Sequence, residues 1–223
     1  MCEIVYNILI TNFTVHRCII RSNAPSNLQM QPLGCIFVYA LNCITFGTAI
    51  DPAAGSGNFL TETYLSLRRL ENEALYEENH GQMLLGVKGE YNPIQVSIGQ
   101  FYGIEINDFA VTVAKTALWI AESQMMQETE KLMQINLNFL PLKSYANIVE
   151  GNALRIDWES VVPKEKLNYI MGNPPFVGYS LQSKEQKSDI LSIYIDEKGK
   201  PYKTAGKIDY VAGWYFKATM LMI

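Results

Sequence analysis

Two clusters in this sequence combine residue types that bind or position small molecules. The first, AIDPAAGSGNFL at residues 49–60, sets an acidic residue and a proline before a Gly-Ser-Gly turn. The second, GNPPF at residues 172–176, sets an asparagine beside two prolines and an aromatic residue. Between them lie an isolated acidic residue, Glu105, and the polar turn GNA at residues 151–153. Each cluster follows a short run that is typical of a β-strand, so all four are candidates for one site.

The glycine turn of the first cluster does not match two common phosphate-binding patterns. A dinucleotide-binding fingerprint requires a third glycine as the helix begins, but Leu60 stands three residues after Gly57. A P-loop requires Gly-Lys-Ser/Thr, which does not follow either. Gly55 and Gly57 still allow the backbone to approach a ligand closely, and Asp51 favours a cation over a phosphate. S-adenosylmethionine (AdoMet), with its sulfonium and ammonium groups, meets these conditions.

Glu105 ends the next apolar run, where a carboxylate can accept hydrogen bonds from both hydroxyls of a ribose. Its distance from Asp51 far exceeds the roughly 20 residues that are typical of dinucleotide-binding folds, and an insertion at residues 79–97 accounts for the excess. Taken alone, a Glu in this place is also explained as a solvated or helix-capping carboxylate. Because Glu105 occurs together with Asp51 and the glycine turn in one strand-end pattern, ribose binding is favoured.

The stretch Asn173, Pro174, Pro175 and Phe176 predicts a site for an exocyclic amine. Two prolines fix an extended backbone and remove two donors, so the carbonyl groups near Asn173 and Pro174 can point outward. An amide oxygen and a carbonyl would then accept two hydrogen bonds from one amine and turn its lone pair toward a methyl group. Phe176 could stack on the base that carries the amine, as in enzymes that act on extruded bases. An ordinary loop turn is the alternative for Asn-Pro-Pro by itself.

Strands alternating with helices are expected to position these clusters. The chain predicts strands over residues 44–50, 99–106 and 167–172, with a further strand starting at residue 146. Such alternation indicates an α/β fold with a mainly parallel sheet and helices on both faces. Ligands bind such sheets at the carboxyl ends of the strands, which is where all four clusters fall.

Helices are expected over residues 58–75 and 107–126, with Asn107 as the N-cap of the second. The polar stretch RRLENEALYEENH at residues 68–80 is typical of a solvated helix face. The stripe of the first helix comprises Leu60, Tyr64, Leu67 and Ala74, and that of the second comprises Ile106, Phe109, Ala110, Val113, Ala117 and Ile120.

Composition limits the function further. At 223 residues and 48% hydrophobic content the chain can bury one main core. Its formal net charge of −4 offers no general attraction to a polyanion, so nucleic-acid binding has to rest on a local patch or another region. The four cysteines lack close pairs, and His16 and His80 lack partners at ligand spacing, so no metal site is expected. The apolar run at residues 33–50 is interrupted by polar residues and lacks signal-peptide features, which favours a cytoplasmic protein with no membrane partner.

These motifs resemble those of class I AdoMet-dependent amino-methyltransferases, and specifically of bacterial N6-adenine DNA methyltransferases. DPAAGSGNFL resembles their first motif, FYGIEI the acidic second, GNALRIDW the third and GNPPFVGY the fourth. The segments DFAVTVAKTALWIAE and KIDYVAGWYFKA are most similar to the large methyltransferases of type IIL restriction-modification and related phage-defence systems. The resemblance implies a Rossmann-like class I methyltransferase core over residues 44–223. Residues 1–43 stay unassigned, either as a lead-in subdomain or as non-native sequence.

The resemblance implies a role for each matched residue. Glu105 would hold the ribose of AdoMet, Ile106 would contact its adenine ring, and Asn152 with Ala153 would meet the edge of that ring. Ala54 stands where the family often has Cys, which should matter little because backbone contacts dominate there. The methionine part of AdoMet would be lined by Asp51, Pro52, Ala53, Ala54, Gly55 and Gly57. The target adenine would be held by Asn173, Pro174, Pro175 and Phe176, with Asp209 and Tyr210 near the site.

The resemblance also implies partners and leaves alternatives. Double-stranded DNA would be the substrate, held through a target-recognition domain that the chain lacks, and restriction or defence proteins would be further partners. The family continues past KIDYVAGWYFKATMLMI with the last strands of the sheet, so a C-terminally truncated sheet is expected. Asn-Pro-Pro followed by an aromatic residue also occurs in enzymes that methylate guanine N2 in ribosomal RNA or glutamine amides in release factors. A catalytically inert remnant that only binds nucleotide is the remaining alternative.

Overall fold

The computed structural model describes residues 47–78, 93–134, 137 and 146–222, and the backbone of four short strands before residue 21. The chain divides into two compact units, Met1–Asn42 and Cys43–Ile223, and all the predicted site residues belong to the second. The described residues of the first unit form two antiparallel pairs: β1 (Ile4–Tyr6) with β4 (Cys18–Ile20), and β2 (Leu9–Ile10) with β3 (Phe13–Thr14).

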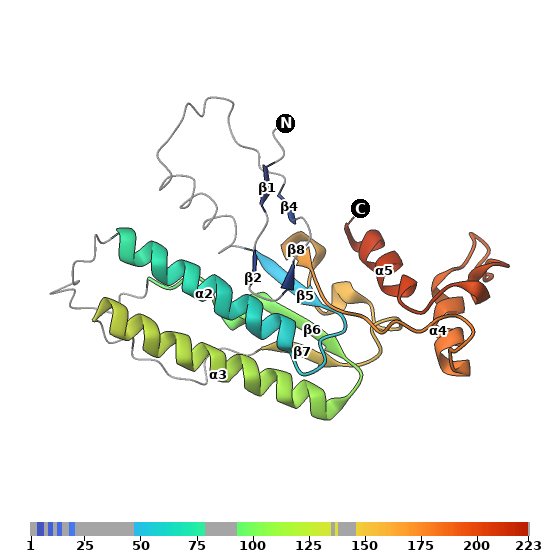
Figure 1. The fold of residues 1–223 in the computed structure, drawn as a ribbon. Coiled ribbons are helices and arrows are strands. Elements are labelled where there is room, and N and C mark those ends of the chain that lie inside the picture. The colour runs from blue at the N-terminus through green and yellow to red at the C-terminus, as the bar shows by residue number, and fades with distance from the viewer. Residues whose placement is uncertain are drawn as a thin grey trace. The chain divides into compact units, whose positions relative to one another are not determined.

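The second unit is built on a four-stranded parallel sheet of order β7-β6-β5-β8 (Figure 1). The predicted α/β fold with a parallel sheet is therefore confirmed. Because β6 and β7 follow β5 on one side while β8 lies on its other side, the strand order reverses at β5. Such a reversal opens a crevice at the carboxyl ends of the two strands that flank it. The strands are β5 (Thr48–Asp51), β6 (Phe101–Glu105), β7 (Asn147–Glu150) and β8 (Leu167–Ile170).

Four α-helices of the described residues accompany the sheet. Helices α2 and α3 lie side by side along one face, while α4 and α5 follow β8 in the chain (Figure 1). The predicted N-cap of α3 is confirmed, since Asn107 Oδ1 accepts a hydrogen bond of 3.1 Å from the Ala110 N–H. The helices are α2 (Asn58–Glu78), α3 (Asp108–Met133), α4 (Lys184–Ile193) and α5 (Ala212–Met222), with short 3-10 turns η1 (Ile98–Gln100), η2 (Trp158–Ser160), η3 (Lys164–Lys166) and η4 (Ala205–Lys207).

Alternate residues of the strands serve two separate hydrophobic cores. On one face, Ala49 and Phe101 pack with residues of α2 and α3 such as Leu60. On the other face, Ile50 and Ile104 pack with a cluster that draws on the segments after β7 and β8. Side chains alternate between the faces of a strand, so a sheet that is covered on both sides needs apolar residues at successive positions. The second core is completed by Ala153, Leu154, Trp158, Val162, Ile190, Tyr210, Trp214 and Leu221.

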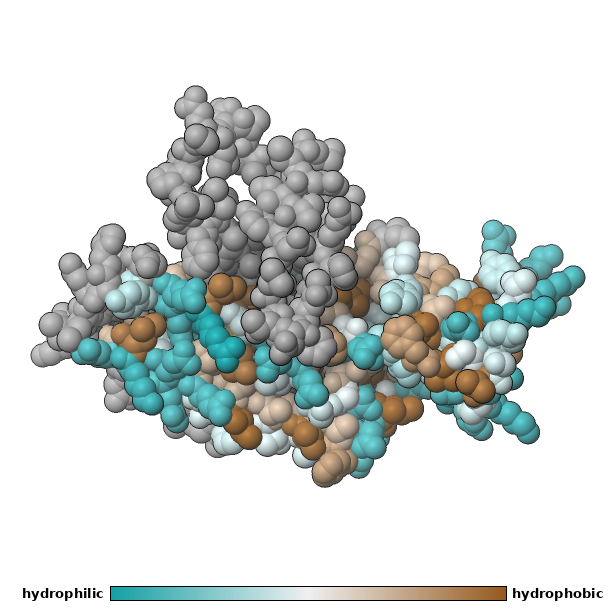
Figure 2. All heavy atoms as spheres, viewed as in Figure 1, coloured by the Kyte–Doolittle hydropathy of each residue, from teal (hydrophilic) through white to brown (hydrophobic). Residues whose placement is uncertain are grey.

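The apolar stripe predicted for the second helix is not the face of α3 that is buried. Ile106 and Phe109 are 67% and 73% exposed, and Ile120 is also exposed. Apolar residues of α3 are visible as brown spheres along the lower edge of Figure 2. The opposite stripe is buried instead, partly because small Ala114 packs closely against Gly57. Its members are Val111, Ala114, Leu118, Ala121, Glu122, Met125, Thr129 and Met133.

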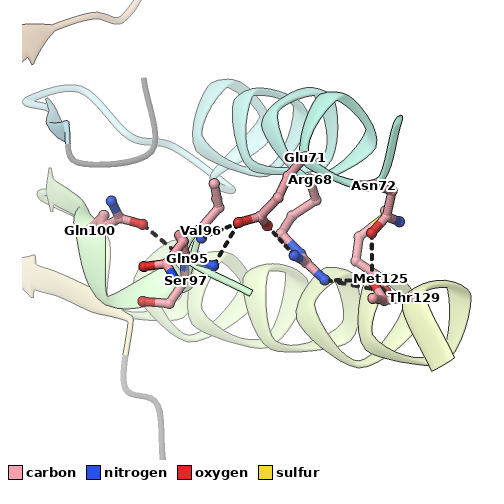
Figure 3. A network of polar contacts seen from close by, with 9 residues as sticks. All are labelled: Arg68, Glu71, Asn72, Gln95, Val96, Ser97, Gln100, Met125 and Thr129. Carbon is pink, nitrogen blue, oxygen red and sulfur yellow. Dashed lines mark hydrogen bonds and ion pairs between the residues drawn. The ribbon is translucent and has the colours of Figure 1, made fainter. Parts of the chain in front are cut away.

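The prediction that residues 68–80 form a solvated face was wrong for the first turns of that stretch. Arg68, Glu71 and Asn72 are buried between α2 and α3 (Figure 3). Arg68 forms an ion pair with Glu71 and donates to Thr129 Oγ1 at 2.8 Å. Glu71 Oε1 also accepts from the backbone N–H groups of Gln95 and Val96, at 2.6 and 3.1 Å. A charge pattern cannot distinguish a solvated face from a paired, buried one, because pairing is set by the facing helix.

Within the described part of the chain, no helix combines the length and apolar character needed to cross a membrane.

Candidate active site

The turn from β5 into α2 has a backbone that glycine makes possible. Gly55 and Gly57 have φ angles of +54° and +81°, in the region that side-chain-bearing residues rarely adopt. A Cβ on Gly57 would lie 2.8 Å from the Cβ of Ala114, so this position also needs glycine for the approach of α3. A Cβ on Gly55 would meet no atom within 4 Å, which places open space on that side of the turn. The turn is therefore tightly packed against α3 at Gly57 and open at Gly55.

Asp51 ends β5 beneath this turn and is fully buried. Its Oδ1 accepts a hydrogen bond of 2.9 Å from the Ala53 N–H, while its Oδ2 has no partner among the described residues. Burial raises the pKa of Asp51 to about 7; the Ala53 hydrogen bond opposes this effect and the charge of Glu105 adds to it. A buried carboxylate oxygen without a protein partner favours a cationic or hydrogen-bond-donating ligand.

Gly172 brings the end of β8 against the same carboxylate. Its φ is +143°, and a Cβ at this position would overlap Asp51 Oδ1. The strand pairing continues just beyond β8, since the Met171 N–H donates to the Ile50 carbonyl at 3.0 Å. The first and fourth clusters are therefore neighbours at the point where the strand order reverses.

Glu105 links three segments at the end of β6. Its Oε2 accepts from the Gly55 N–H at 2.9 Å and its Oε1 from the Asn107 N–H at 3.0 Å. Its own carbonyl accepts from the Gly151 N–H at 2.8 Å. Each carboxylate oxygen can accept a further hydrogen bond, so the side chain can hold the turn and a ligand together. Ile106 follows directly and is largely exposed.

In the turn after β7, the side chain of Asn152 is held by hydrogen bonds within the protein. Asn152 Oδ1 accepts from the Leu154 N–H at 2.9 Å, and Asn152 Nδ2 donates to Asp189 at 2.9 Å. Ala153 is buried, and its carbonyl accepts from Trp158 Nε1 at 2.8 Å and from Lys217 Nζ at 2.9 Å. The structure thus fixes this turn firmly through contacts that the sequence did not predict.

The residues after β8 are largely open to solvent. Asn173 and Pro175 are exposed, Pro174 is half-buried and Phe176 is 72% exposed. Among the described residues, no hydrogen bond involves the Asn173 amide or the Pro174 carbonyl. An exposed aromatic ring that follows an exposed amide in the chain is suited to binding a flat base, and the role of residues 173–176 stays a prediction.

Helix α5 and the residues before it form hydrogen bonds with the backbone of the site segments, and the sequence analysis did not predict most of these contacts. Trp214 Nε1 donates to the Pro52 carbonyl at 2.9 Å, and Lys217 also donates to the Ile156 carbonyl. The Tyr210 N–H donates to the Val177 carbonyl at 2.9 Å. Burial lowers the pKa of Lys217. The only sequence signal was the resemblance of KIDYVAGWYFKA to a known segment, since a Trp and a Lys three residues apart are unremarkable on an apolar helix.

The comparisons with known proteins decide the family. The family model described as "MmeI, DNA-methyltransferase domain" matches residues 40–223. This chain belongs to the MmeI DNA-methyltransferase domain family. DNA methyltransferase A of Bacillus subtilis (strain 168) is 42% identical over 170 residues, which are 74% of this chain and 18% of that protein.

A solved structure of the type IIL restriction-modification enzyme MmeI in complex with DNA has the same fold. It matches with a TM-score of 0.73 and 38% sequence identity, over 85% of this chain and 24% of that one. The chain therefore spans about a quarter or less of the length of these relatives. The predicted relation to type IIL DNA methyltransferases is confirmed.

Proposed function

We propose that this domain transfers a methyl group from AdoMet to the N6 amine of adenine in DNA. The observation that carries the proposal is the buried Asp51 carboxylate, whose Oδ2 has no partner among the described residues and which lies against Gly172, the residue before Asn173. The family supports a DNA methyltransferase, and the site chemistry supports the donor and the target atom.

The residues around Asp51 fit a ligand that carries positive charge. An unpartnered buried carboxylate would gain most from an ammonium or sulfonium group nearby. The open space beside Gly55 allows a ligand to lie along the backbone of the turn. In this proposal the methionine part of AdoMet is lined by Asp51, Pro52, Ala53, Ala54, Gly55 and Gly57.

The nucleoside part of AdoMet is assigned to the ends of β6 and β7. Glu105 accepts the ribose hydroxyls with the lone pairs that the backbone bonds leave free, and the exposed face of Ile106 contacts the adenine ring. Ala153 and Asn152 contact the edge of the adenine ring. Asn152 Oδ1 already accepts from Leu154 and Asn152 Nδ2 already donates to Asp189, so the side chain would bind the ring with its remaining lone pair and N–H.

The target base is assigned to the residues after β8. Asn173 Oδ1 and the Pro174 carbonyl accept the two N6 hydrogens, Pro175 stiffens the backbone, and Phe176 stacks on the extruded adenine. When bound, AdoMet supplies a methyl group whose bond to sulfur breaks as the bond to N6 forms, with the electron pair left on sulfur. Water takes the N6 proton, which is acidic only after the transfer, so this mechanism needs no strong base. Catalysis then comes from positioning and fixed dipoles.

DNA as the substrate is supported by the relatives. The similar MmeI structure was determined in complex with DNA, and the B. subtilis relative is a DNA methyltransferase. The net charge of −4 gives no general attraction to a duplex. The proposal therefore assigns most of the duplex capture to regions that the longer relatives have beyond the matched segment, with restriction or defence proteins as further partners.

The substitution Asn173→Ala tests the role of the base-holding residues. We expect it to lower methyl transfer at least a hundredfold while the AdoMet affinity changes less than about threefold, because Asn173 acts only on the target amine. Transfer from labelled AdoMet and binding by calorimetry give the two quantities. Asn168→Ala, an asparagine change at the other end of β8, is the matched control.

An equal loss of AdoMet binding and transfer in Asn173→Ala would contradict this role. Chromatographic and mass-spectrometric identification of the methylated product on DNA, ribosomal RNA and release factor then decides the substrate. N6-methyladenine in DNA is the expected product, and methylated guanine or glutamine amide would replace this proposal with the corresponding alternative.

A further inference from the structure

Asp189 of α4 is a buried carboxylate that belongs to none of the four clusters. It is 3% exposed and accepts hydrogen bonds from three side chains. Its Oδ1 accepts from Arg155 Nε at 2.6 Å, and its Oδ2 accepts from Asn152 Nδ2 and from the Tyr210 hydroxyl, both at 2.9 Å. Burying a carboxylate is costly unless it is paired and hydrogen-bonded, so this arrangement needs all its donors.

Two of these donors lead toward the AdoMet side of the proposed site. Asn152 uses Oδ1 to accept from the Leu154 N–H, so its amide is fixed at both ends. Arg155 lies three residues further along the same turn. The position of residues 151–155 is therefore tied to Asp189 by two side chains.

The third donor leads toward the base side of the proposed site. Tyr210 donates its hydroxyl to Asp189 and its backbone N–H to the carbonyl of Val177, the residue after Phe176. Its neighbour Asp209 accepts from the Tyr179 N–H at 2.8 Å. The segment that follows Phe176 is thus held by residues 209–210, and Tyr210 in turn is held by Asp189.

We propose that Asp189 is a positioning residue that couples the turn after β7 to the segment after Phe176. One oxygen atom, Oδ2, accepts from both Asn152 and Tyr210, so a shift of either donor disturbs the hydrogen bond of the other. A ligand that orders the turn at residues 151–154 would thereby also order residues 177–179. The functional meaning of this coupling rests on the proposed function, whereas the coupling itself is a property of the free chain.

Amide hydrogen exchange of the ligand-free chain tests the coupling directly. Three backbone amides report on it: those of Leu154, Tyr179 and Tyr210. We expect Asp189→Ala to speed exchange at all three by about tenfold or more, since each loses a partner or its support. Asp189→Asn keeps an acceptor in the place of Oδ2 and should restore most of the protection. Tyr210→Phe should speed exchange at Tyr179 and Tyr210 in particular.

Thr129→Val serves as the matched control. It removes buried hydrogen bonds between α2 and α3, on the other face of the sheet, and should lower global stability without a selective effect on the three reporters. If Asp189→Ala and Thr129→Val speed exchange at the reporters equally for equal loss of stability, Asp189 has only a structural role and the proposal is overturned. Failure of Asp189→Asn to restore protection would also overturn it.

S-adenosylhomocysteine, the demethylated product of AdoMet, provides the second arm of the experiment. In the unsubstituted chain it should slow exchange at Leu154 and at Tyr179 and Tyr210, whereas in Tyr210→Phe it should slow exchange at Leu154 alone. Slowing at Leu154 alone in the unsubstituted chain would overturn the coupling. No binding of S-adenosylhomocysteine would instead count against the proposed function, and the ligand-free arm would still decide the coupling.

Discussion

Asp51 is a fully buried carboxylate at the proposed ligand site. Burial raises its pKa to about 7, and its free oxygen has no partner among the described residues. In the folded chain it therefore keeps a proton that the unfolded chain, with an ordinary pKa of 3.8, releases at lower pH. The folded state binds more protons, so the contribution of Asp51 to stability falls as the pH rises from about 4 to about 7.

Asp51→Asn should remove this loss of stability. At pH 8 without ligand, we expect the variant to unfold at a higher urea concentration than the unsubstituted chain, and at pH 4 to differ little from it. Urea unfolding at the two pH values measures the effect. A variant that is equally destabilised at both pH values would contradict the pKa shift.

The same carboxylate should make AdoMet binding depend on pH. A positively charged ligand favours ionised Asp51, so binding releases a proton near pH 7 and the affinity should rise about tenfold between pH 6 and pH 8. Calorimetry in buffers of different ionisation enthalpy measures the released proton. Asp51→Asn is the control for titration of the ligand's own amino group, and an equal pH dependence in both proteins would assign the effect to the ligand.

At the scale of elements, the polar network between α2 and α3 sets how the chain returns to the sheet. Glu71 holds both Arg68 and the backbone of Gln95 and Val96, directly before η1 and β6 (Figure 3). The network therefore anchors the end of the insertion at residues 79–97, of which residues 79–92 lie outside the described part of the chain. It positions the start of β6, the strand that delivers Glu105 to the site.

Glu71→Ala should lower the free energy of unfolding by about 3 kcal/mol, because it removes the carboxylate that pairs with buried Arg68 and the shared acceptor of two backbone N–H groups. Glu71→Gln, which keeps an oxygen acceptor, should cost less. Glu73→Ala on the exposed face of the same helix is the matched control and should change stability by less than about 0.5 kcal/mol. Urea unfolding gives the three values, and equal losses at positions 71 and 73 would contradict the role of the network.

At the scale of the whole second unit, the proposed cofactor and target base would together touch the carboxyl ends of all four strands. Asp51, Glu105, the turn at residues 151–153 and the segment at 173–176 come from β5, β6, β7 and β8 in turn. A cofactor that bridges the ends of β5, β6 and β7 binds the folded sheet and not the unfolded chain. It should therefore stabilise the sheet as one cooperative body.

S-adenosylhomocysteine at about 100 times its dissociation constant should add about 2.7 kcal/mol to the stability of the unit. Glu105→Ala should lose most of this gain, because it removes the ribose acceptor and frees the N–H groups of Gly55 and Asn107. Glu105→Gln keeps acceptor capacity and should retain more of the gain. Thermal melts at several ligand concentrations measure it, and an undiminished shift in Glu105→Ala would contradict its role.

Local sequence determined the motifs, the strand–helix alternation and the N-cap of α3, because turn chemistry and periodicity act over a few residues. Only the tertiary structure decided which stripe of α3 is buried, since both stripes of that helix carry apolar residues and the choice depends on the fit of Ala114 against Gly57. The same holds for the burial of Arg68 and Glu71 and for the convergence of Asn152 and Tyr210 on Asp189. These contacts join residues far apart in the chain, and no spacing in the sequence encodes which distant donor meets which acceptor.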